Sequence, residues 1–235
     1  WRDDGLERLR QRAHDPRRWL GEPLEPGPPL LLYAEQGLGD TIHMARYVKR
    51  IAERGVRVVL EVQPPLRSLL SRLDGAAGVI AAGEPRPVFD RLCPLMSLPL
   101  ACAHASGASV ARTAYVRADE GRVAHWREQL APARGPRVGL AWSGNPAYVN
   151  DRDRSVALAR LAPLLRPQVQ WIGLQRDVRA CDREALEGMP QLEVPGERIR
   201  DFDDAAALVE LCDLVVSVDT SAAHLAGAMG KPAWI

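Results

Sequence analysis

The chain has 235 residues, of which 46% are hydrophobic and 26% charged, a composition that is ordinary for a folded globular protein. Its 31 basic and 30 acidic side chains leave a formal net charge of +1, whereas nucleic-acid binding requires a basic excess on one face, so we expect no nucleic-acid partner. The longest apolar runs are shorter than the ~20 residues of a membrane helix, so we expect no membrane span.

The first part of the chain is expected to precede the folded lobes. Apolar residues recur at helical spacing over residues 4–14, until Pro16 interrupts them. Residues 21–29 hold four prolines in nine positions, which predicts a stiff connector. We therefore interpret residues 1–29 as a helical segment and a Pro-rich linker. Because the chain begins at Trp1, we interpret it as a piece of a longer protein with further helical sequence upstream.

Residues 30–132 predict a first α/β lobe, in which short apolar runs typical of buried strands alternate with helices. The runs lie at residues 30–34, 56–62, 79–80, 88–89 and 115–116. A helix with an apolar stripe follows the first run, and Gly55 ends it. Pro64 opens another helix at a position where proline is tolerated. A helix over residues 119–130 closes the lobe.

A Pro/Gly hinge at residues 132–136 separates this lobe from a second one over residues 136–235. Strands are expected at residues 138–142, 169–174, 192–194 and 214–218, and helices at 158–165, 205–211 and 220–229. Strands that alternate with helices imply parallel sheets with right-handed crossovers. The predicted fold class is therefore α/β, with two Rossmann-like lobes facing a cleft. Residues 232–235 read as the start of a strand, so we expect the second lobe to be truncated.

Ligands of open parallel sheets bind beyond the carboxyl ends of the strands, and three loops at such ends have unusual content. In the first, Gly37 and Gly39 allow close approach of the backbone to a ligand, and Asp40 lies in the first turn of the following helix. The alternative is that Asp40 caps this helix and the glycines only make the turn. The loop is not a full dinucleotide fingerprint, because Ile42 stands at the position of the third glycine.

The second loop follows the first strand of the second lobe. Ser143, Gly144 and Asn145 form a glycine turn, and Arg152 and Arg154 follow it. Guanidinium groups pair well with phosphate oxygens, so this loop is a candidate pyrophosphate site. The alternative is a solvated loop with local Asp–Arg pairs.

The third loop joins the most apolar strand directly to a helix. Thr220 and Ser221 offer N–H groups and hydroxyls at the helix N-terminus, which predicts a phosphate site. Asp219 either caps the helix or accepts from a sugar hydroxyl. His224, one turn later, either reaches a phosphate or the substrate, or is a packed histidine.

The Gly37–Asp40 segment and the segment over residues 219–232 resemble glycosyltransferase family nine, which contains the ADP-heptose:lipopolysaccharide heptosyltransferases. Residues 142–146 with Arg152 and Arg154 look more like a bacterial branch that is attached to tetratricopeptide repeats. The resemblance covers residues 30–235. It implies a GT-B fold, with acceptor in the first lobe and nucleotide-sugar donor in the second.

The resemblance also implies roles for single residues. Asp40 falls at the general base of the family, and Thr220, Ser221 and His224 fall in its donor-phosphate loop. It implies that no metal and no other cofactor is needed. Asp151 and Asp153 have the spacing of an Asp-x-Asp motif but lie within the candidate pyrophosphate loop. The four cysteines show no C-x-x-C spacing, which indicates neither a zinc site nor a redox pair.

We therefore predict an inverting, metal-independent glycosyltransferase that uses a nucleoside-diphosphate sugar. Its acceptor is expected to be a glycan, a lipid-linked glycan or a protein, and upstream helical repeats would provide a surface for a protein partner. Sparse cysteines fit a reducing compartment, so a cytoplasmic location is expected. Two alternatives remain open: a non-catalytic nucleotide-sugar-binding or scaffold domain, and a GT-B-fold nucleotide-sugar epimerase.

Overall fold

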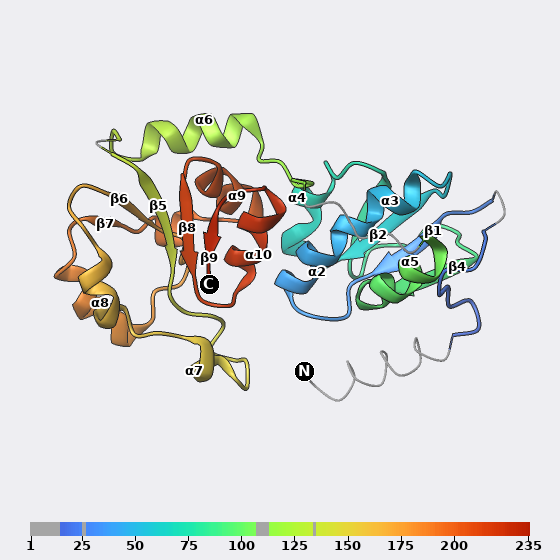
Figure 1. Ribbon diagram of the computed structural model, residues 1–235, viewed down its shortest axis with the longest axis horizontal. Coiled ribbons are helices and arrows are strands. Elements are labelled where there is room, and N and C mark those ends of the chain that lie inside the picture. Colours follow the sequence, from blue (N-terminus) through green and yellow to red (C-terminus); the bar gives the residue numbers. More distant parts are fainter. Residues whose placement is uncertain (1–14, 25–26, 107–112, 134) are drawn as a thin grey trace. The chain divides into compact units, whose positions relative to one another are not determined.

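The computed structural model describes residues 15–24, 27–106, 113–133 and 135–235 (Figure 1). The chain divides into two compact units, Trp1–Arg112 and Thr113–Ile235. The helix expected over residues 4–14 lies outside the described residues. The division falls between Arg112 and Thr113, earlier than the hinge expected at residues 132–136.

The first unit contains a four-stranded parallel sheet. Its strands are β1 (Leu30–Tyr33), β2 (Val58–Val62), β3 (Ala76–Ala81) and β4 (Arg91–Pro94), in the order β3-β2-β1-β4. The expectation of a strand at residues 88–89 is wrong. Val88 is 81% exposed, and the chain pairs with β1 only from Arg91, where Leu92 and Cys93 enter the core.

The helices of the first unit are short and often begin or continue as 3-10 turns. They are α2 (Leu38–Met44), η1 (Ala45–Tyr47), α3 (Val48–Ala52), η2 (Pro64–Leu66), α4 (Arg67–Leu70), η3 (Leu95–Ser97) and α5 (Leu98–Ser106). The expected apolar stripe is confirmed, because Met44, Val48 and Ile51 are buried. It spans three consecutive elements and ends at Gly55, whose φ of 81° suits glycine. The sequence analysis missed η3 and α5.

Part of the expected linker is integrated into the first unit. The backbone N–H of Trp19 donates to the Leu92 carbonyl at 2.8 Å, and the Leu92 N–H donates to the Arg17 carbonyl at 3.1 Å. The side chain of Trp19 is 1% exposed. Residues 17–19 therefore lie beside β4, because a large apolar side chain inserts into the core there.

The second unit contains a five-stranded parallel sheet. Its strands are β5 (Arg137–Ala141), β6 (Gln170–Gly173), β7 (Leu192–Glu193), β8 (Leu214–Ser217) and β9 (Ala233–Trp234), in the order β7-β6-β5-β8-β9. All five lie where the sequence predicted strands. The run at residues 115–116 is not a strand, because the N–H groups of Tyr115 and Val116 both donate to the Ala228 carbonyl, at the end of a helix.

The helical segments of the second unit connect and cover these strands. They are α6 (Glu120–Gln129), α7 (Asp151–Arg154), η4 (Leu158–Leu164), α8 (Ala180–Glu187), η5 (Gly196–Arg198), α9 (Phe202–Glu210) and α10 (Ser221–Ala228). The predicted helix at 158–165 is a 3-10 segment with Pro163 inside it. The sequence analysis missed α8.

Helix α6 is part of the second unit, although the sequence analysis assigned it to the first lobe. Its Trp126 Nε1 and Arg122 Nη1 both donate to Asp204 Oδ1 of α9 at 3.0 Å. Asp204 is fully buried, and its two carboxylate oxygens accept hydrogen bonds from these donors and from Arg200. This network attaches α6 to α9 and explains why the division between the units precedes the helix.

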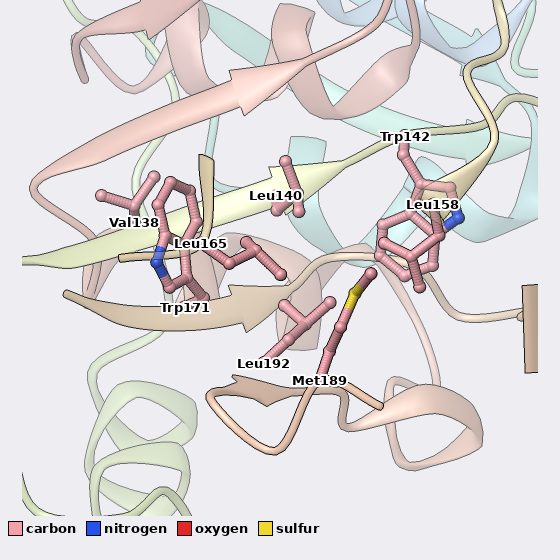
Figure 2. Close-up of a cluster of buried hydrophobic side chains, with 8 residues drawn as sticks. All are labelled: Val138, Leu140, Trp142, Leu158, Leu165, Trp171, Met189 and Leu192. Carbon is pink, nitrogen blue, oxygen red and sulfur yellow. The ribbon is translucent and has the colours of Figure 1, made fainter. Parts of the chain in front are cut away.

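The core of the second unit joins β5, β6 and β7 to η4 (Figure 2). Its buried members are Val138, Leu140, Trp142, Leu158, Leu165, Trp171, Met189 and Leu192. Figure 2 shows Trp142 and Leu158 together at one end of the cluster, where β5 leaves the sheet. Burial of side chains of this size stabilises by about 1.5–3 kcal/mol each, so the start of the loop after β5 is firmly held.

Candidate functional site

Each sheet has a point at which the strand order reverses. In the first unit β1 has β2 on one side and β4 on the other, and in the second unit β5 lies between β6 and β8. Ligands of open α/β sheets bind at such switch points, beyond the carboxyl ends of the strands. The first predicted loop leaves β1, and the second and third leave the neighbouring strands β5 and β8.

In the first loop, Asp40 has a structural task. Gly37 is the N-cap of α2, and its N–H donates to Asp40 Oδ2 at 3.0 Å, as in a capping box. This is the contact that the helix-capping interpretation predicts, and the role of general base stays a prediction. It occupies one carboxylate oxygen, and among the described residues Asp40 Oδ1 has no hydrogen bond. Gly39 has an ordinary helical conformation within α2.

The loop is also fixed from β2. Gln63, directly after β2, donates from Nε2 to the Gln36 carbonyl at 2.7 Å. Its Oε1 accepts from the hydroxyl of the buried Thr41 at 3.0 Å. These contacts hold residues 36–41 in one conformation. Asp40 therefore sits on a fixed element, as a catalytic group requires.

The sequence analysis missed a second carboxyl group at this edge of the sheet. Glu35 follows β1, and its oxygens accept from the N–H groups of Leu95 at 3.1 Å and Met96 at 2.9 Å. Burial raises the pKa of Glu35, and the negative charge of Asp40 adds to this effect against the opposing backbone hydrogen bonds. Its position as the first charged residue after a buried strand was the available signal.

In the second loop, Gly144 packs against the ends of two side chains. A Cβ atom there would lie 2.6 Å from Arg154 Nη2 and 2.6 Å from Asp151 Oδ1. The Gly144 N–H donates to Ser155 Oγ at 3.0 Å. The sequence predicted a glycine turn here, and the structure places the Arg154 guanidinium against Gly144.

Ser143 and Asn145 build the loop. Ser143 is buried and makes two hydrogen bonds with Gln175. The Ser143 N–H donates to Gln175 Oε1 at 3.2 Å, and Gln175 Nε2 donates to Ser143 Oγ at 3.0 Å. Asn145 Oδ1 accepts from the Ala147 N–H at 2.9 Å in a local turn. Both side chains therefore have structural partners, Ser143 in the segment after β6 and Asn145 within its own loop.

Arg154 brings the second and third loops together. Its Nη1 donates to the Asp219 carbonyl at 3.0 Å, and its guanidinium carbon lies 4.9 Å from the centre of the Tyr148 ring. Its Nε lies 3.5 Å from Asp151 Oδ1. By contrast, Arg152 is exposed on α7 and makes no hydrogen bond or ion pair with the described part of the chain. The structure thus unites only one of the two predicted arginines with the third loop.

A further arginine, Arg179, was missed by the sequence analysis. It is the N-cap of α8, and its Nη2 donates to Asp151 Oδ2, to the Gly144 carbonyl at 3.0 Å and to Ser155 Oγ at 3.1 Å. Burial by itself would raise the pKa of Asp151, but hydrogen bonds from Arg179 and Ser155, with the charges of Arg179 and Arg154, outweigh it and lower this pKa. Asp151 is therefore a carboxylate at neutral pH, flanked by two guanidinium groups.

The ends of the same loop are held by Asp182, three residues after Arg179. Asp182 Oδ2 accepts from Trp142 Nε1 at 3.0 Å, and Oδ1 accepts from the Leu158 N–H at 2.9 Å. The Val156 N–H donates to the Trp142 carbonyl at 2.9 Å and closes the loop at its base. The first turn of α8 thus contacts both the middle and the ends of the loop after β5.

The third loop presents the N-terminus of α10. Thr220 is the N-cap and its side chain does not cap the helix; its Oγ1 instead lies 3.1 Å from Ser217 Oγ. The N–H groups of Ser221 and Ala222 make no hydrogen bond within the described residues. His224 Nε2 lies 3.8 Å from Asp219 Oδ1. Free N–H groups at a helix N-terminus favour an anion.

These contacts place Gly144, Arg154 and the residues of the third loop at one edge of the second sheet. The guanidinium groups of Arg154 and Arg179 balance the carboxylates of Asp151 and Asp219, and the dipole of α10 adds a positive partial charge. The arrangement suits a phosphate group. Within the described residues, His, Cys, Asp and Glu side chains nowhere form a group of three or more that is suited to a metal ion. Among the helices of the described residues, none has the length and apolarity to cross a membrane.

Two parallel sheets, each with its loops at a switch point, define a protein with two Rossmann-like units. Residues 169–233, from β6 to β9, match the family model of glycosyltransferase family 9 (heptosyltransferase). The match includes the whole third loop, Asp219 to His224, and supports the resemblance drawn from the sequence.

Solved structures show the same fold. The chain is similar to the Escherichia coli ADP-heptose lipopolysaccharide heptosyltransferase II, with 16% identity over 87% of this chain and 83% of that chain, and a TM-score of 0.59. It is also similar to a family 9 glycosyl transferase from Veillonella parvula, with 10% identity over 90% of this chain and 82% of that chain, and a TM-score of 0.63. The predicted GT-B-like class with two Rossmann-like parallel sheets is thus confirmed.

A relative is also found among characterised sequences. Protein FlbA of Caulobacter vibrioides is 28% identical over 242 residues, which cover 92% of this chain and 40% of that protein. The chain thus spans well under half the length of this relative. The attachment to tetratricopeptide repeats stays a prediction.

Proposed function

We propose that the protein transfers a sugar from a nucleoside-diphosphate sugar to an acceptor hydroxyl, with inversion at the anomeric carbon and without a metal ion. The observation that carries the proposal is the contact of Arg154 with the Asp219 carbonyl, beside the free N–H groups of α10. It supports a diphosphate site built from the loops after β5 and β8. The match of residues 169–233 to glycosyltransferase family 9 supports the same chemistry.

In this proposal the second unit stabilises the leaving group. Negative charge develops on the diphosphate as its bond to the anomeric carbon breaks, and preorganised donors lower the energy of that state. The N–H groups of Ser221 and Ala222 and the guanidinium of Arg154 are such donors. No divalent cation is required if these groups neutralise the diphosphate. Arg154→Ala and Thr220→Pro should each weaken nucleotide binding, because they remove a phosphate partner and disturb the helix N-terminus, respectively.

The first unit would contribute the general base. The acceptor oxygen forms a bond to the anomeric carbon and loses its proton to Asp40, whose Oδ1 is available while Oδ2 holds the Gly37 N–H. The carbon–oxygen bond to the diphosphate breaks in the same step, which inverts the configuration. The acceptor is a glycan, a lipid-linked glycan or a protein in this proposal.

One observation favours the alternative of a non-catalytic nucleotide-sugar-binding domain. The capping contact of Asp40 with Gly37 explains the presence of this carboxylate without any reaction. The two functions differ in what they require of Asp40, so substitution of this residue decides between them.

The test compares Asp40→Asn with Asp40→Ala in the full-length protein. Asparagine keeps an oxygen for the Gly37 N–H but cannot accept the proton, so sugar transfer should fall by roughly 10²–10⁴-fold while nucleotide affinity and stability stay unchanged. Alanine removes both roles and should also cost about 1 kcal/mol of stability, typical of a lost cap. If wild type binds a nucleotide sugar but transfers to no acceptor, and Asp40→Asn matches it throughout, the protein is a binding domain.

A further inference from the structure

The contacts around Asp151 form a chain that crosses three elements. Arg179, at the start of α8, donates to Asp151 of α7. Asp151 Oδ1 lies 3.5 Å from Arg154 Nε, and Arg154 Nη1 donates to the Asp219 carbonyl at 3.0 Å. The order is therefore Arg179, Asp151, Arg154 and then the third loop. Within the described residues, Arg179 contacts Asp151, Gly144 and Ser155 and not the third loop, whereas Arg154 contacts that loop directly.

The carboxylate in the middle of this series of contacts is buried, and the guanidinium groups on either side of it are partly exposed. The Asp151 side chain is 6% exposed, and those of Arg154 and Arg179 are 27% and 25% exposed. A buried carboxylate needs both charge and hydrogen bonds to stay ionised. Arg179 supplies these, and in the same position it holds the Gly144 carbonyl and Ser155 Oγ, on either side of Asp151 in the sequence. Without Arg179, Asp151 would have Arg154 as its remaining cationic partner.

The consequence concerns the direction of Arg154. With Arg179 present, Asp151 Oδ1 lies 3.5 Å from Arg154 Nε without a hydrogen bond, and Arg154 Nη1 donates to the Asp219 carbonyl. Without Arg179, the Arg154 guanidinium would be drawn toward the uncompensated carboxylate, since ion pairing of a buried charge dominates local geometry. Asp151 would then compete with any phosphate for the same guanidinium.

We propose that Arg179 is a positioning residue for the donor site: it neutralises Asp151 and fixes the loop after β5, so that Arg154 is free to bind the diphosphate. The inference rests on the proposed function for the identity of the ligand. It adds that donor affinity depends on an arginine that acts through Arg154.

The test is a double-mutant cycle on nucleotide affinity, measured calorimetrically with ADP, UDP and GDP on the full-length protein. Arg179→Gln should raise the Kd about tenfold, and Arg154→Ala should raise it by a similar factor. In the double variant the Kd should match that of Arg154→Ala alone, because the two residues act in one chain. Arg179→Lys keeps the charge opposite Asp151 and should recover a large part of the affinity. The control is Arg183→Gln, which removes an exposed charge one turn later on α8.

Two results would overturn the inference while leaving the proposed function intact. One is wild-type affinity in Arg179→Gln. The other is a double variant whose Kd rises by the product of the single effects, which would mean that Arg179 acts independently of Arg154. The thermal midpoints of all variants are measured alongside. If Arg179→Gln weakened binding by unfolding the protein, its midpoint would fall, and the variant would also weaken binding in the Arg154→Ala background.

A second measurement keeps the inference testable if no nucleotide binds to wild type, an outcome that refutes the proposed function. The Gly144 N–H is bonded to Ser155 Oγ, which itself accepts from Arg179. Hydrogen exchange at Gly144 and Ser155 should therefore be at least about tenfold faster in Arg179→Gln than in Arg183→Gln. Equal exchange in the two variants would refute the fixing of the loop by Arg179.

Discussion

Replacing Asp182 by alanine should destabilise the second unit through the loss of two buried hydrogen bonds. Asp182 is 3% exposed. Its oxygens accept from Trp142 Nε1 at 3.0 Å and from the Leu158 N–H at 2.9 Å. Alanine removes both acceptors and leaves two donors in the core without a partner.

The expected magnitude follows from the number of donors. An unsatisfied buried donor costs about 1–3 kcal/mol, so Asp182→Ala should lower the free energy of unfolding of the second unit by roughly 2–6 kcal/mol. Asp182→Asn keeps one acceptor oxygen and should lose about half as much. Trp142 and Leu158 flank the loop that contains Gly144 and Arg154, so nucleotide affinity should fall together with stability.

Urea unfolding followed by tryptophan fluorescence measures the effect, because Trp126, Trp142 and Trp171 all lie in the second unit. A shift of the midpoint at constant slope gives the change in stability. Glu184→Ala is the control, since Glu184 is exposed on the same helix. Trp142→Phe removes one of the two donors, so Asp182→Ala should cost less in that background.

The reasoning fails if Asp182→Ala unfolds at the same urea concentration as Glu184→Ala. It also fails if the cost of Asp182→Ala is identical with and without the Trp142 indole N–H. The first result would mean that the two buried hydrogen bonds contribute nothing to the free energy of unfolding, and the second that the bond from Trp142 contributes nothing.

Two further predictions concern pH and metal ions. Because burial raises the pKa of Glu35, its contribution to stability is fully present below the unfolded pKa and is lost as pH rises through the folded pKa. Urea midpoints from about pH 4 to about pH 8 should therefore fall for wild type relative to Glu35→Gln, and parallel curves would contradict this. Calorimetric titration of ADP, UDP and GDP should give the same Kd with and without EDTA. A strict requirement for Mg²⁺ or Mn²⁺ would show that Arg154 and the N-terminus of α10 do not suffice for the diphosphate.

The strands were largely predictable because most contain a short apolar run, and the two central strands of the first sheet are buried along their whole length. All four residues of β1 are buried, as are all five of β2. The sequence alone also determined the positions of the three loops, since a glycine-rich or Thr/Ser-rich segment directly after such a run must lie at the carboxyl edge of a parallel sheet. The strand predicted at residues 88–89 is absent, because two apolar residues show no period and pairing with β1 begins only at Arg91.

Only the tertiary structure decided which polar side chains act together. Arg179 meets Asp151 across 28 residues of sequence, and Asp182 meets Trp142 across 40. No local pattern reports such contacts, because they depend on β5 and β6 lying side by side. The same reason separated Arg154, which reaches the Asp219 loop, from Arg152, which lies two residues earlier and is exposed. Positions two residues apart in α7 point in different directions, and the sheet order determines which direction meets the neighbouring loop.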